Sequence, residues 1–358
     1  METQLLQRNA DAFLTARIAE AESGIARRDL LRIIGLAGLG LGFNLQSGLA
    51  ERWSPDSATA KAGAEIIPHG DLLVGLDIGT SKVCVAVGER QLGGTIKIHG
   101  IGQVPSLGIR GGEVVDPEAA GRCVREALVA AEVKCDMMIG SLHLAVYGGP
   151  SIHGFGRRAT NSIRCVQNLN IEVRDVVFRP IASAQAVLDP DQMNRGALVI
   201  DIGAGTTCYA VYANGEIKDL RWRSVGGDRI ISDLGLRFPM ISTSRVREIE
   251  TLERCWRVWA IFDRIKARIE TSGVRLDSLG AGVHLTGGCS LLRGIDGIAE
   301  WVFDIPAQLA RVTGVSCAVS AIENPGYSCA IGLLKLGATD RTNLGARYFG
   351  VLPESHVP

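Results

Sequence analysis

Two short segments, about 124 residues apart, share a pattern of one aspartate followed by glycines and hydroxyl residues. The first reads Leu-Asp-Ile-Gly-Thr-Ser-Lys over residues 76–82, and the second reads Ile-Asp-Ile-Gly-Ala-Gly-Thr-Thr over residues 200–207. Each lies between two apolar runs, which predicts a β-hairpin with the glycines in its turn. Glycine lets the backbone approach a phosphate, and the exposed N–H groups and hydroxyls of such a turn bind anions. One such turn is most often a plain hairpin, but two predict duplicated domains that hold one nucleotide between them.

Two further features extend this prediction. An aspartate, Asp77 or Asp201, ends the first strand of each hairpin, and a carboxylate there suits a hydrated Mg²⁺ that shares the nucleotide phosphates. A third segment, Thr286-Gly287-Gly288, follows the apolar run 283–285. A strand that ends in this way lets the backbone approach a flat ring closely, which predicts a surface for adenine and ribose.

Composition excludes several classes of protein. At 358 residues the chain has room for two domains with their own cores. Lys and Arg total 38, as do Asp and Glu, so no net charge favours nucleic acid or anionic membrane as a partner. The 9 cysteines include no C-x-x-C pair and no histidine spacing suited to zinc. Residues such as Cys84, Cys165 and Cys255 are therefore expected to be buried thiols in a reducing compartment.

Residues 1–70 differ in character from the rest of the chain. Arg27 and Arg28 precede an apolar run over residues 33–43, and residues 54–70 have the composition of a linker. The paired arginines resemble an export signal, but an exported ATP-binding domain would have no ATP, and about 11 apolar residues are too few to span a bilayer. A helix that packs on the body, membrane contact through residues 30–45 and a misassigned start codon remain open.

From residue 72 onward the sequence alternates between strand and helix patterns, which predicts an α/β protein. Strands are expected at 142–147, 176–178 and 283–285, and helices at 161–170, 181–188, 245–270 and 325–336, with others starting at 116 and 226. The helices at 181–188 and 325–336 are rich in small residues, which allows two helices to cross closely. The predicted organisation is a first domain over 71–190, a second over 191–325, a closing helix over 326–340 that returns to the first domain, and a tail over 341–358.

In this order and spacing, the segments resemble the actin/Hsp70/hexokinase superfamily, and within it the FtsA family of bacterial cell-division proteins. The superfamily likeness lies in the two glycine turns, the two small-residue helices and the Thr-Gly-Gly segment. The FtsA likeness lies in residues 74–83, 98–102, 105–116, 180–184 and 226–233, and the resemblance covers about residues 72–338. It implies an actin-like, ribonuclease H-like fold with duplicated domains around a nucleotide cleft.

The resemblance also implies a Mg²⁺·ATP site between the domains. Asp77 and Asp201 would orient the metal ion. The nucleotide would be bound by Gly79, Thr80, Ser81, Lys82, Gly203, Gly205, Thr206, Gly227, Gly287 and Gly288. Gln185 begins the phrase Gln-Ala-Val-Leu, where the actin-like pattern has the glutamine that positions the attacking water. The other interpretation of Gln185 is an ordinary polar residue on a helix surface, so the implied activity is at most that of a slow ATPase.

The chain departs from the family pattern at several points. The subdomain that FtsA carries after the strand at 142–147 is largely missing, and so is the lobe that docks FtsZ, which would fall between residues 250 and 254. The C-terminal amphipathic membrane helix is missing as well. Cys208 stands where the second turn usually has an aspartate, and residues 246–250 reverse the charges expected beside the ribose and adenine.

Three functions of different classes remain open. The first is an FtsA-like ATP-binding scaffold of cell division in the cytoplasm or at the inner face of the plasma membrane. Its implied partners are FtsZ and other divisome proteins, with self-association left open; a pilus-assembly relative is a variant of this class. The second is an actin-fold interaction module that no longer binds nucleotide. The third, a small-molecule kinase or phosphatase, is disfavoured because no suitable aspartate or inserted substrate pocket is found.

Overall fold

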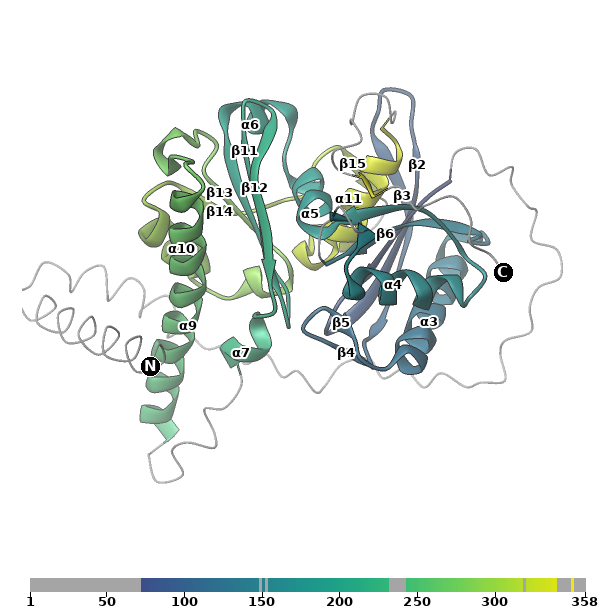
Figure 1. Ribbon diagram of the computed structural model, residues 1–358, viewed down its shortest axis with the longest axis horizontal. Coiled ribbons are helices and arrows are strands. Elements are labelled where there is room, and N and C mark those ends of the chain that lie inside the picture. The colour runs from purple at the N-terminus through teal and green to yellow at the C-terminus, as the bar shows by residue number, and fades with distance from the viewer. Residues whose placement is uncertain are drawn as a thin grey trace, which may run out of the picture. The chain divides into compact units, whose positions relative to one another are not determined.

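The computed structural model describes residues 72–147, 150–151, 154–231, 243–317, 320–339 and 349–350 (Figure 1). The predictions for residues 1–70, including the segment 30–45, lie outside the described residues. Among the described helices, none is both long and apolar enough to cross a membrane. All nine cysteines are free thiols; Cys84 and Cys165 are buried as predicted, whereas Cys255 is only half-buried.

The first sheet is built around β1 (Leu72–Ile78), whose side chains are almost all buried. On one side of β1 the chain forms an antiparallel meander with β2 (Lys82–Arg90) and β3 (Ile96–Pro105). On the other side, β6 (Ser141–Val146) and β9 (Glu172–Phe178) run parallel to it. Adding β15 (Val315–Cys317) and β16 (Phe349–Gly350) at the edges gives the order β15-β3-β2-β1-β6-β9-β16.

The second sheet repeats this arrangement around β10 (Ala197–Ile202). Its order is β12-β11-β10-β13-β14, and the other strands are β11 (Thr207–Ala213), β12 (Glu216–Arg223), β13 (Val283–Thr286) and β14 (Ala307–Leu309). As in the first sheet, two antiparallel strands lie on one side of the first strand and two parallel strands on the other. The prediction of duplicated α/β domains is therefore confirmed, and we call them the first and second lobes.

Helices cover the outer face of each sheet. In the first lobe these are α3 (Pro117–Cys135) and α4 (Arg157–Gln167). Asp116 caps α3 by accepting hydrogen bonds from two backbone N–H groups, and a left-handed Asp136 ends the helix. In the second lobe, α9 (Thr243–Thr271) and α10 (Ile295–Phe303) bury their apolar sides on the sheet, with Phe262 and Phe303 in contact.

Two helices lie between the sheets, α5 (Arg179–Val187) and α11 (Ser328–Gly337) (Figure 1). A Cβ atom on Gly332 of α11 would collide with the carbonyl oxygen of Ala182 in α5. The predicted close crossing of two small-residue helices is thus confirmed, because only a glycine lets the backbones approach this far.

The chain returns to the first sheet earlier than predicted. Strand β15 pairs with β3, although it lies inside the range 191–325 assigned to the second domain. Strand β16, from the range predicted as a tail, pairs with β9. Both corrections have the same cause: β3 and β9 are sheet edges, and an unpaired edge offers hydrogen bonds to any extended segment that reaches it.

The reductions predicted from the family pattern are visible in the described residues. The residues described between β6 and α4 form two short strands, β7 (Pro150–Ser151) and β8 (Gly154–Phe155). Helix α9 runs without a break through residues 250–254, where the second missing lobe would be inserted. Helix α4 begins at Arg157, four residues before the predicted start at 161.

Candidate functional site

Both glycine turns form at the ends of the expected strands. The Gly79 N–H donates to the Lys82 carbonyl at 3.0 Å, and the Gly203 N–H donates to the Thr206 carbonyl at 2.8 Å. The two turns therefore close in the same way, as their similar sequences predict. Ser81 is exposed at the tip of the first turn.

The two turns contact each other where the first and second lobes meet, a region that we call the cleft. A Cβ atom on Gly205 would lie 2.6 Å from Oγ1 of Thr80, so the Thr80 side chain packs directly on the second turn. The Gly112 N–H donates to the same Oγ1 at 3.1 Å. The hydroxyl that was expected to bind a phosphate is thus engaged by protein, and Gly205 is required for the close approach.

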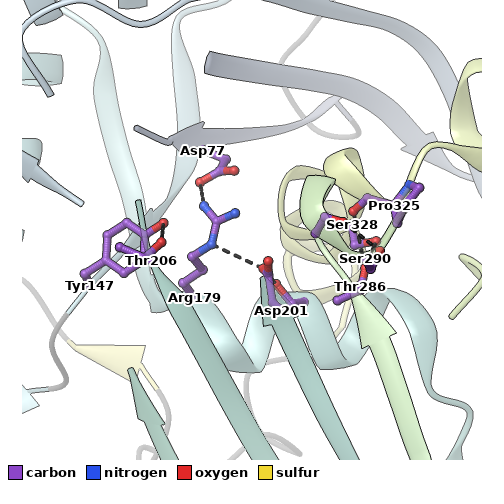
Figure 2. Close-up of polar contacts among 11 residues, drawn as sticks. Asp77, Tyr147, Arg179, Asp201, Thr206, Thr286, Ser290, Pro325 and Ser328 are labelled. Carbon is purple, nitrogen blue, oxygen red and sulfur yellow. Dashed lines mark hydrogen bonds and ion pairs between the residues drawn. The ribbon is translucent and has the colours of Figure 1, made fainter. Parts of the chain in front are cut away.

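A buried arginine lies between the two aspartates (Figure 2). Arg179, the first residue of α5, is 6% exposed, and its guanidinium is bonded to Oδ1 of Asp77 through Nη1 and to Oδ2 of Asp201 through Nε, the latter at 3.2 Å. The Ser183 hydroxyl donates to the same oxygen of Asp201 at 2.5 Å. Asp77 comes from the first lobe and Asp201 from the second, so Arg179 joins the lobes.

The electrostatics of this group favour a charged guanidinium. Burial opposes the charge, but Asp77, Tyr147 and Asp201 outweigh it and raise the pKa of Arg179 well above its ordinary value. Arg179 was not among the residues that the sequence predicted for the site. The available signal was a lone basic residue immediately before Pro180, between the apolar end of β9 and a helix of small residues.

Tyr147 packs beside Arg179 and contacts the second glycine turn. The Thr206 hydroxyl donates to its phenol oxygen at 2.8 Å, and the Tyr147 ring centroid is 5.3 Å from Cζ of Arg179. Its ring also lies 5.8 Å from that of Trp222 in β12. Thr206, a predicted phosphate ligand, is therefore buried against the first lobe.

The Lys82 ammonium group packs against an aromatic ring. Its Nζ lies 4.2 Å from the ring centroid of Tyr327 in η5 (Pro325–Tyr327), the turn that leads into α11. A Cβ atom on Gly326 would be 2.6 Å from the same nitrogen. Burial lowers the pKa of Lys82.

The predicted adenosine surface is only partly open. The Thr286 hydroxyl is bonded to Pro325 and Ser328, and the Gly287 N–H donates to the Pro325 carbonyl at 3.2 Å (Figure 2). A Cβ atom on Gly287 would collide with Asp201, whereas one on Gly288 would have no heavy atom within 4 Å. Gly288 therefore faces free space, and Gly287 faces the carboxylate.

Gly227, predicted to contact nucleotide, packs on protein as well. A Cβ atom there would collide with Sγ of Cys289, which itself donates to the Gly203 carbonyl at 3.4 Å. Burial raises the pKa of Cys289 to about 11, so the thiol stays protonated near neutral pH and acts as a packing group.

Gln185 is half-buried on α5, roughly 9 Å along the helix axis from Arg179 by helix geometry. Its predicted catalytic role remains a prediction.

The residues present do not fit the predicted Mg²⁺ ion. Mg²⁺ needs a nearly octahedral shell of oxygens, and the carboxylates of Asp77 and Asp201 have the right chemistry. Arg179, however, occupies the place between them, and Oδ1 of Asp201 is buried there without a hydrogen-bond partner. Among the described residues no cluster of His, Cys, Asp and Glu suited to a metal is found.

A cavity of about 330 Å³ lies away from the cleft, on the outer layer of the second lobe. It is lined by Trp259, Asp263, Lys266, Ala267, Glu270, Trp301 and Val302. Trp259 is half-buried, and its ring centroid lies 6.4 Å from that of Trp301.

Sequence comparison relates the chain to one family. The family model described as "Cell division protein FtsA" matches residues 198–332. Cell division protein FtsA of Neisseria meningitidis is 26% identical, in an alignment that covers 78% of this chain and 93% of that protein. The FtsA proteins of Pseudomonas aeruginosa and Escherichia coli K12 are 24% and 23% identical, each over 76% of this chain and 90% and 91% of their own lengths.

Comparison with solved structures shows an actin-like fold. The PilM–PilN type IV pilus biogenesis complex matches with a TM-score of 0.58 and 13% identity, over 75% of this chain and 99% of that chain. The ethanolamine utilization protein EutJ from Carboxydothermus hydrogenoformans gives 0.53 and 18%, over 75% and 92%. MreB5 of Spiroplasma citri bound to ADP gives 0.50 and 17%, over 75% and 96%. At these identities the likeness concerns the fold alone.

Proposed function

We propose that this divergent FtsA-like chain is a scaffold of bacterial cell division, which works by binding other proteins and does not turn over Mg²⁺·ATP. Similarity to FtsA proteins over about three quarters of the chain supports the division role. The place of action that goes with this role is the cytoplasm, at the inner face of the plasma membrane. Membrane contact through residues 30–45 remains a prediction.

The observation that carries the second half of the proposal is the contact between the two glycine turns. A phosphate chain held between such turns needs their N–H groups and hydroxyls to face free space. Here the Thr80 side chain packs on Gly205, and the Thr206 hydroxyl is bonded to Tyr147. The threonine hydroxyls that would bind phosphates are engaged by protein groups, so the actin-like core serves as a rigid body for protein contacts.

FtsZ is the first partner to test, because the lobe that FtsA uses to dock it is reduced here. The purified full chain would be mixed with FtsZ filaments from the same organism, with Mg²⁺·ATP and without nucleotide, and then sedimented. We expect the protein in the pellet to the same extent in both samples. Since FtsZ filaments themselves need GTP, filament mass must be shown to be equal in the two samples.

Two outcomes would contradict the proposal at different points. Pelleting that requires Mg²⁺·ATP would show that nucleotide still controls partner binding, against the closed cleft. No pelleting with intact filaments would exclude FtsZ as the tethered partner. The PilM likeness favours no second function, since it is a likeness of fold, whereas the sequence similarity is to FtsA.

A further inference from the structure

We infer that Arg179 is a built-in cation of the cleft, which takes the place of a divalent metal ion between Asp77 and Asp201 and joins the lobes without metal. The inference rests on the contacts of the cleft alone. It therefore holds whichever partner proteins the chain binds.

The first argument is the charge balance of the cleft. Asp77 is 3% exposed and Asp201 is 2% exposed, and each is the next-to-last residue of its strand, β1 in the first lobe and β10 in the second. Two buried carboxylates repel each other and lose their hydration, so a cation has to lie between them if both are ionised. The cation in this structure is the guanidinium, bonded to each carboxylate through a different nitrogen.

The second argument is the set of contacts that hold the guanidinium in place. The Tyr147 ring packs beside it, at 5.3 Å between the ring centroid and Cζ, which is within the range of a cation–π contact. Ser183, one turn along α5 from Arg179, donates to the same oxygen of Asp201 that Arg179 binds, and so holds the carboxylate in place. A planar fork with several donors suits two carboxylates better than a lysine would.

The third argument is the position of Arg179 in its helix. The N-terminus of a helix carries partial positive charge, so a cation at the first position is disfavoured. Arg179 is that residue in α5, and no side chain caps the helix there. Helix formation therefore does not explain the arginine, whereas the two carboxylates that meet it do.

The test measures metal binding and thermal stability of the full chain. Mn²⁺ would serve as the paramagnetic probe, followed by the loss of its free-ion EPR signal, and melting would be recorded in EDTA, Mg²⁺ and Mn²⁺. For the wild-type protein we expect no stoichiometric Mn²⁺ binding at 0.1 mM and the same melting temperature in all three solutions, within about 1 °C.

Arg179→Gln should convert the cleft into a metal site, because two buried carboxylates then lack a cation. We expect this variant to melt several degrees lower in EDTA, to bind one Mn²⁺, and to recover most of the lost melting temperature in Mn²⁺. The double variant Arg179→Gln, Asp201→Asn should lose that Mn²⁺ site. Arg195→Gln is the matched control, because Arg195 forms an exposed ion pair with Asp191 outside the cleft.

Two results would overturn the inference. One is stoichiometric Mn²⁺ binding by the wild-type protein that Asp201→Asn abolishes, and this result needs no Arg179 variant to fold. The other is an Arg179→Gln protein that matches the wild type in both melting temperature and metal indifference. Both measurements are made without a partner protein, so their outcome is separate from that of the FtsZ experiment.

Discussion

Burying an arginine at the first position of a helix is energetically unfavourable, because the guanidinium loses its hydration and lies at the positive end of the helix dipole. Here four side chains compensate for this cost. Asp77 and Asp201 supply opposite charge, Tyr147 supplies a ring face, and Ser183 orients one of the carboxylates. Each of these contacts joins residues that are far apart in the sequence or lie in different lobes. Changes at this cluster should therefore affect the folded state as a whole.

The contribution of Ser183 can be measured directly. Ser183 is fully buried, and its hydroxyl donates to Asp201 at 2.5 Å. Ser183→Ala leaves a buried carboxylate with one donor fewer, so we expect the free energy of unfolding in urea to fall by about 1–3 kcal/mol. Ser278→Ala removes an exposed hydroxyl that bonds only to a nearby carbonyl, and it should change stability by less than about 0.5 kcal/mol. Equal effects of the two variants would contradict this assignment.

Lys335 should make the free energy of unfolding depend on pH. Burial lowers its pKa to about 8, with Asp189 opposing the shift, whereas an unfolded lysine titrates near 10.4. Between these values the unfolded chain binds more protons than the folded one, so Lys335 makes the free energy of unfolding rise with pH. Below about pH 8 Lys335 is protonated in the folded chain, so burial of its charge lowers the free energy of unfolding by the full amount.

Lys335→Met should remove that cost. We expect the variant to be more stable than the wild type at pH 7, by up to about 3 kcal/mol, with the advantage shrinking between pH 8 and pH 10. Urea unfolding at a series of pH values measures this. Lys218→Met, at an exposed lysine paired with Glu216, is the control and should leave the pH profile unchanged. A constant difference across the whole pH range would refute the prediction.

At the scale of elements, the contact between α5 and α11 holds the centre of the molecule. Both helices are buried on nearly all sides, which their small residues permit. Because Gly332 lies against the backbone of Ala182, the helices cannot move apart without disturbing β1 and β10, on which they pack. The position of Arg179 in the cleft depends on this crossing.

Gly332→Ala tests the crossing. The added methyl group would overlap a backbone carbonyl, which cannot rotate away, so we expect a loss of about 1–3 kcal/mol or more. Gly297→Ala in α10 is the matched control, because a Cβ atom there would meet nothing within 4 Å. That change should stabilise the protein by about 0.5–1 kcal/mol through helix propensity. Chemical denaturation of both variants decides the matter, and a neutral Gly332→Ala would exclude the close crossing.

At the scale of the whole described body, the lobes also meet along a seam outside the cleft. Trp222 of β12 contacts Tyr147, and the guanidinium of Arg158 from α4 lies 4.7 Å from the Trp222 ring centroid. Gly111 of the first lobe accepts hydrogen bonds from Arg158 and from Ser224 of the second. The relative position of the lobes is thus fixed by protein contacts on two sides.

Trp222→Ala should loosen this seam. The ring contact with Tyr147 and the cation–π contact with Arg158 are both lost, and each is worth about 0.5–1.5 kcal/mol. We expect faster amide hydrogen exchange in β12 and α4, with α10 unchanged. Trp301→Ala is the control, since that ring is 45% exposed and lies on the outer layer of the second lobe. Unchanged exchange in β12 would show that the seam carries no stability.

Features that depend on a few neighbouring residues could be predicted from the sequence. The glycine turns, the apolar strands beside them and the start of α3 after Asp116 follow from alternation, helix-capping and turn chemistry, which are local properties. Their repetition then predicted two similar lobes, and the strand orders of the two sheets confirm this. The resemblance to FtsA rested on the same local segments, and the sequence comparisons support it.

Only the tertiary structure decided what the turns and aspartates contact. Arg179 meets an aspartate 102 positions away, and Thr80 meets a glycine of the other hairpin. The sequence pattern marked Asp77 and Asp201 for a metal ion because carboxylates at strand ends have the same local pattern whether their partner is Mg²⁺ or arginine. Which of these cations binds the aspartates depends on which one the folded chain brings within hydrogen-bonding distance of them in the buried site. The packing of α5 between the two sheets brings Arg179 there.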